Sequence, residues 1–109
     1  LAVEIFGSDQ QGNCDEQRGG VVYCDGIRRS FSPGERIILK PGQSITLLPG
    51  DWHAFWGHDG DVLVGEVSTV NDDSDDNIFR DKVSRFSDID EDTAPIHLLV
   101  SDYEKWLNA

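Results

Sequence analysis

The chain has 109 residues, which is enough for one domain of ordinary size and too few for two. Nine Lys and Arg stand against 21 Asp and Glu, and the formal charge of −12 argues against binding to nucleic acid or to an anionic membrane surface. No apolar run approaches the ~18 residues of a membrane-spanning helix, and no basic-then-apolar signal peptide is present. We therefore expect a single domain over residues 1–109 that resides in the cytoplasm.

The beginning of the chain is unusual, because it starts at Leu1 and the sequence contains no Met. Leu1 also opens directly into a strand-like run. We therefore expect the chain to be the C-terminal portion of a longer protein. A site assembled from both portions would then have only some of its residues here.

Short apolar runs recur between turn signals at close intervals, a pattern typical of an all-β sandwich or barrel. Asp25-Gly26 predicts a two-residue hairpin, because both of its turn positions require positive φ. Pro-Gly pairs bound other runs. We expect about eight strands before Asn71, among them residues 1–6, 21–24, 27–31, 36–40, 44–48, 53–56 and 62–70, with a polar loop over residues 10–20.

Residues 71–92 differ in composition, with nine Asp or Glu against three Lys or Arg. One interpretation is a solvated, poorly ordered acidic loop. The alternative, which we favour, is a long ordered loop, because large apolar side chains are spaced through the acids and would anchor it to the barrel. These anchors are Ile78, Phe79, Val83, Phe86 and Ile89.

The end of the chain predicts one more strand, over residues 96–100, and then a short helix. Ser101 and Glu104 have the spacing of a capping box, with Ser101 as the N-cap. The helix would continue through Leu107 and pack its aromatic side chains on the sheet.

Few residues suggest chemistry on their own. No Ser lies in a nucleophile elbow, and Cys14 and Cys24 have no zinc spacing, so inert thiols are the simplest interpretation. His58 lies in a Gly- and Asp-rich loop, and His97 lies in the last expected strand. His53 differs, because it follows a Pro-Gly turn at the start of an aromatic strand.

The surroundings of His53 resemble a known pattern. Residues 40–53, KPGQSITLLPGDWH, resemble the second conserved motif of the cupins, small barrels in which this Pro-Gly turn leads to a metal-binding histidine. Further on, GEVSTVNDD at residues 65–73, the Asp76-Asn77 pair, Arg85-Phe86 and Glu91-Asp92 resemble one cupin family, the D-lyxose isomerases, which are similar to L-ribose isomerases. The resemblance extends from residues 6–9 to residues 102–103.

This resemblance implies a cupin-like jelly-roll barrel with a long acidic loop and a short C-terminal helix. It also implies a divalent metal, most often Mn²⁺, held by a His-x-His pair, a Glu and a later His. No His-x-His pair occurs in this sequence. His53 matches the later ligand, and the barrel is expected to be incomplete, with its N-terminal strands outside this chain.

The resemblance further implies an aldose–ketose isomerase, converting D-lyxose to D-xylulose and D-mannose to D-fructose by proton transfer through an enediol. Such a reaction needs a base that moves a proton between C1 and C2, and Glu66 is our candidate. A four-residue loop over 58–61 would place His53 opposite Glu66, whereas a register shifted by one residue would put Glu66 on the other face. Expected substrate contacts are Arg85, Asp73, Asp76, Glu91, Trp52 and Phe55.

Two other classes of function stay open: a cupin that binds a sugar without turnover, and an interaction domain whose aromatic strands form a dimer face. The acids that follow the strand with Glu66 favour the isomerase, because a bare barrel has no need of them. We also expect a homodimer with a monosaccharide as its ligand.

Overall fold

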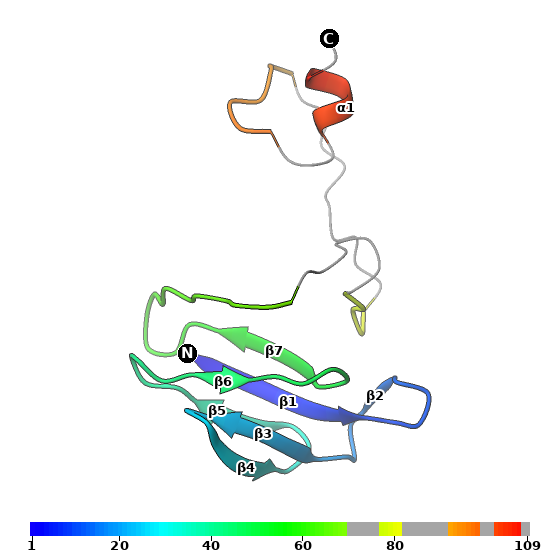
Figure 1. Cartoon of the computed structure of the whole chain (residues 1–109), viewed down its shortest axis with the longest axis vertical. Coiled ribbons are helices and arrows are strands. Elements are labelled where there is room, and N and C mark those ends of the chain that lie inside the picture. Colours follow the sequence, from blue (N-terminus) through cyan, green and yellow to red (C-terminus); the bar gives the residue numbers. More distant parts are fainter. Residues whose placement is uncertain (70–76, 82–91, 99–101, 108–109) are drawn as a thin grey trace.

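The computed structural model describes residues 1–69, 77–81, 92–98 and 102–107. Its described elements are strands and one short helix (Figure 1). The strands are β1 (Ala2–Ser8), β2 (Cys14–Asp15), β3 (Gly20–Cys24), β4 (Ile27–Phe31), β5 (Glu35–Ile38), β6 (Ile45–Thr46) and β7 (Trp52–Trp56), and the helix is α1 (Tyr103–Trp106).

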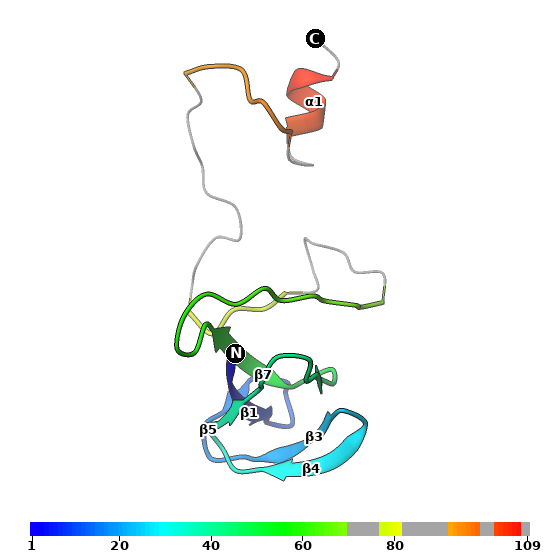
Figure 2. The ribbon, with the colours of Figure 1, turned by 90° about the vertical axis from the view of Figure 1, so that its left-hand side faces the viewer.

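The strands form two antiparallel sheets. In the first, β1 pairs with β5 from Ala2 to Ile5 and with β7 from Ala2 to Phe6, while the end of β1 pairs with β2. In the second, β3 lies between β4 and β6. Figure 2 shows the β3–β4 hairpin as a layer beneath β1 and β7. The all-β prediction is confirmed, whereas closure into a jelly-roll barrel stays a prediction.

The hydrophobic core lies between the two sheets. Alternation along β1 places Val3 and Ile5 on one face, since successive strand residues point to opposite sides. The ring of Phe31 from β4 covers Gly20 so closely that a Cβ there would lie 2.7 Å from the ring. The complete buried cluster consists of Val3, Ile5, Val22, Phe31, Ile37 and Leu39.

The turns follow the sequence signals closely. The β3–β4 hairpin turns at Asp25 (φ 49°) and Gly26 (φ 78°), as predicted for a turn with two positive φ angles. Each Pro-Gly pair also makes a turn, with a positive φ at Gly34, Gly42 and Gly50. These glycines allow the left-handed conformation that the third position of a type II turn requires.

Several expected elements are wrong in the described residues. Residues 62–69 form no strand, although they follow a turn with positive φ at Asp59 (φ 60°) and Gly60 (φ 131°). Residues 96–98 also form no strand, and Asp102 holds the N-cap position of α1 in place of Ser101. Ser101 itself and most of the acidic loop, apart from residues 77–81 and 92, lie outside the described residues. The expected polar loop over 10–20 contains the short strand β2.

No described helix could cross a bilayer.

Candidate functional site

His53 is the second residue of β7, and its position follows from the pairing of that strand. It lies directly opposite Ile5 of β1, and Phe55 lies opposite Val3. Residues directly opposite each other project from the same face of a sheet, and Val3 and Ile5 face the core. His53 and Phe55 therefore project from the core-facing side, where their rings stack at a centroid distance of 6.3 Å. Both side chains are exposed, because no described residue covers them there.

The imidazole of His53 has a fixed partner. Its Nδ1 lies 3.1 Å from the backbone carbonyl oxygen of Asp51. A carbonyl oxygen can only accept, so Nδ1 must carry the proton in this hydrogen bond. In the neutral ring, Nε2 then keeps its lone pair, which is the form in which imidazole binds a metal ion.

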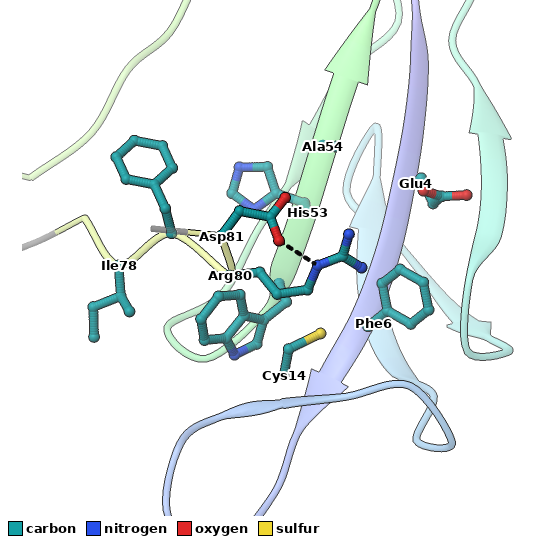
Figure 3. A pocket seen from close by; sticks show the side chains of 10 residues that line it. Glu4, Phe6, Cys14, His53, Ala54, Ile78, Arg80 and Asp81 are labelled. Carbon is teal, nitrogen blue, oxygen red and sulfur yellow. Dashed lines mark ion pairs between the residues drawn. The ribbon is translucent and has the colours of Figure 1, made fainter. Parts of the chain in front are cut away.

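A cavity of about 260 Å³ lies against β7 and β1 (Figure 3). Arg80 crosses β7 toward Phe6 and forms ion pairs with Glu16 at 3.2 Å and with Asp81 at 3.7 Å. The residues that line the cavity are Glu4, Phe6, Cys14, Trp52, His53, Ala54 and residues 78–81.

Two of the predicted site residues, His53 and Trp52, are among the residues that line this cavity. As neighbours on β7 their side chains project from opposite faces of the sheet, and Trp52 shares its face with Phe6, which lies opposite it on β1. The indole Nε1 of Trp52 donates to the carbonyl oxygen of Gly12 at 3.2 Å, which ties the start of β7 to the β1–β2 connection. Phe55 does not line the cavity. Burial raises the pKa of the Cys14 thiol, and this disfavours the thiolate and supports the interpretation of an inert cysteine.

Glu66 is exposed and lies in residues 57–69, which carry no strand. The predicted register, with His53 opposite Glu66, is wrong, because residues 57–69 form no strand that could pair with β7. The strand that pairs with β7 is β1, where Ile5 lies opposite His53. The prediction assumed that a loop of hairpin length closes a local hairpin, whereas β7 pairs with a strand far away in the sequence. Asp73, Asp76, Arg85 and Glu91 lie outside the described residues.

Among the described residues, no three His, Cys, Asp or Glu side chains gather into a possible metal site. The described residues therefore supply no complete ligand set, and His53 could contribute at most one ligand to a metal centre. Sequence reasoning missed Asp51, Glu16 and Arg80. Asp51 could have been found, because each Pro-Gly pair is followed by a residue that can accept a hydrogen bond.

The structure thus defines an all-β protein in which one histidine is presented from the core-facing side of a sheet. A sequence profile of the D-lyxose isomerase family matches residues 1–103, and the chain belongs to that family. It is 46% identical over 109 residues to a D-lyxose/D-mannose isomerase of Serratia proteamaculans, and 41% identical over 108 residues to one of Escherichia coli O157:H7. These alignments cover 98% and 97% of this chain, and the chain spans about half (47%) of the length of each relative.

Proposed function

We propose that the full-length gene product is a divalent-metal-dependent aldose–ketose isomerase that acts on D-lyxose and D-mannose. The names of the two relatives support the substrates. The observation that carries the proposal is the hydrogen bond from His53 Nδ1 to Asp51, because it leaves Nε2 available as a ligand atom. A bound Mn²⁺ ion would polarise the sugar's carbonyl and hydroxyl oxygens.

The proton transfer needs a group of this chain or of the rest of the protein. Glu66 remains our proposed base, on the motif that it shares with the family rather than on its position. A carboxylate can take the proton from C2 and return it to C1, which makes it base and then acid in one cycle. Asp73 and Glu91 are the next candidates, with Asp73, Asp76, Arg85, Glu91, Trp52 and Phe55 proposed to contact the sugar.

The proposal is tested by measuring interconversion of D-lyxose and D-xylulose, and of D-mannose and D-fructose, with the full-length gene product loaded with Mn²⁺. We expect turnover of both pairs and its loss on chelation. Loaded protein that binds a sugar but converts neither pair would overturn the proposal in favour of a binding protein.

His53→Ala tests the ligand. Loss of an outer partner of a metal-bound histidine costs about 10–100-fold in affinity, so loss of the ligand itself should cost at least about 100-fold. Titration with Mn²⁺ measures this. His58→Ala is the matched control, because His58 is an exposed loop histidine that pairs with its neighbour Asp59 at 3.3 Å. Equal affinities in the two variants would remove His53 from the metal site.

Glu66→Gln tests the base. The variant should keep the fold and the metal but lose at least about 100-fold in turnover, the usual scale for a general base. Steady-state assays alongside metal titration separate the two effects. Near-normal turnover would transfer the role to Glu91 or Asp73.

A further inference from the structure

The turn that precedes β7 is closed twice by Asp51. The Asp51 backbone N–H donates to the carbonyl of Leu48 at 3.0 Å, and the Asp51 carboxylate accepts the Leu48 N–H at 2.7 Å. Gly50 adopts φ 90°, which a side chain at that position would strain. The direction of the Asp51 carbonyl is therefore set by a turn that hydrogen bonds close on both sides.

This turn is also fastened to the rest of the first sheet. The Ser8 hydroxyl at the end of β1 donates to the carbonyl of Gly50, and the Trp52 indole donates to Gly12. The loop that contains Gly12 is itself held by Asp9, whose carboxylate accepts the N–H groups of Gln11 and Asn13 at 2.9 and 2.8 Å. The residues on both sides of Asp51 thus have fixed partners, and its carbonyl has little freedom to turn away from His53.

The direction of that carbonyl matters because of the chemistry of imidazole. A neutral histidine in water favours the proton on Nε2, which would block that nitrogen as a ligand. The Asp51 carbonyl, 3.1 Å from Nδ1, can accept a hydrogen bond only from the form that carries the proton on Nδ1, so its position favours that form. Since the carbonyl belongs to the backbone, its direction depends on the turn and on the bonds that fasten the turn to the first sheet.

We propose that Asp51 is a positioning residue for His53: its carboxylate closes the turn that directs its own carbonyl at Nδ1 and so keeps Nε2 free to bind a metal. The metal-binding role of His53 in this inference rests on the proposed function. The tautomer that the inference assigns to His53 does not require a bound metal. Asp51 itself is not proposed to touch metal or substrate.

The other Pro-Gly turns provide an internal comparison. Glu35 accepts the Ser32 N–H at 2.9 Å, and Gln43 accepts the Lys40 N–H at 2.8 Å, in the same way as Asp51 accepts that of Leu48. Neither of those turns is followed by a histidine two residues later. Loss of the Gln43 side chain should therefore weaken a turn of the same design without changing His53.

The experiment records long-range proton–nitrogen correlation spectra of the metal-free, full-length gene product at a pH where the histidines are neutral. We expect His53 mainly as the Nδ1–H tautomer, with His58 and His97 as references in the same spectrum. Asp51→Ala should move His53 toward the Nε2–H tautomer and weaken Mn²⁺ binding about tenfold. Asp51→Asn, which keeps an acceptor oxygen, should retain the wild-type tautomer and the wild-type Mn²⁺ affinity. Gln43→Ala should change neither the tautomer nor the affinity.

Two outcomes would overturn the inference. One is a wild-type His53 in the Nε2–H form. The other is a folded Asp51→Ala whose His53 tautomer is unchanged and matches that of Gln43→Ala. Failure of the proposed function looks different. In that case the tautomer responds to Asp51 as expected, but added Mn²⁺ leaves the His53 signals where they are.

Discussion

Two regions of this chain contain similar aliphatic residues, which are buried in one region and exposed in the other. In the packed body, formed by residues 1–51, Ile5 and Ile37 are 0% and 1% exposed. In the open segment, residues 57–69, Leu63 is fully exposed and Val62 and Val64 are nearly half exposed. The difference lies in pairing: β1 has partners on both edges and a second sheet over one face, whereas the open segment pairs with no described strand. Hydrophobicity alone does not produce burial here, and the buried side chains of β1 have both strand partners and a covering sheet.

The difference in packing between the two regions is tested most directly by truncating one side chain in each. Ile5→Ala should lower the free energy of unfolding by about 2–5 kcal/mol, because it leaves a cavity between the sheets. Leu63→Ala should change it by less than about 0.5 kcal/mol, since the side chain contacts mostly water. Urea denaturation of the two variants measures both values. Similar losses in both would mean that the open segment packs as tightly as the body.

Adding a methyl group to a glycine in each region tests the same difference in packing, by filling space instead of removing atoms. Gly20→Ala places a Cβ 2.7 Å from the Phe31 ring and should destabilise the chain by about 1–3 kcal/mol. Gly65→Ala meets no atom within 4 Å, so it should be neutral or stabilise by up to about 1 kcal/mol through the unfolded state. Thermal unfolding gives the two shifts. A neutral Gly20→Ala would show that the ring moves away easily and that the core is loosely packed.

The smallest expected effect is the contribution of the Glu35 carboxyl to the pH dependence of stability. The hydrogen bond from the Ser32 N–H, aided by the Arg29 guanidinium, lowers the pKa of the Glu35 carboxyl despite the opposing effect of burial. Because the folded pKa lies below the unfolded one, the contribution is present at neutral pH and is lost as the pH falls through the folded value. For a partly exposed pair we expect at most about 1 kcal/mol.

Glu35→Gln checks this effect, because Gln43 shows that a glutamine can close the same kind of turn. Stability measured across acidic pH should depend less on pH in the variant than in the wild type. Gln43→Ala should lower stability by a similar amount at every pH. An unaltered pH dependence in Glu35→Gln would assign the acid sensitivity to other carboxylates.

The sequence predicted the local features of the fold well. Asp25-Gly26 and the Pro-Gly pairs were found where φ requirements restrict the choice of residue, and most strands before residue 57 lie close to their expected positions. His53 was also correctly placed on a strand after a turn. The strand at 62–70 was wrong in its described residues, because an apolar run becomes a strand only where a hydrogen-bonding partner is available.

In the candidate site, too, some features depend on local sequence and others on strand pairing. The sequence by itself determined the turn at residues 48–51 and the presence of a histidine just after it, since both depend on neighbouring residues. Only the tertiary structure decided that Ile5 lies opposite His53, that His53 therefore projects from the core-facing side, and that its Nδ1 meets the carbonyl of Asp51. The physical reason is that strand pairing joins residues nearly fifty positions apart, and a shift of one residue in register would turn every side chain of β7 to the other face.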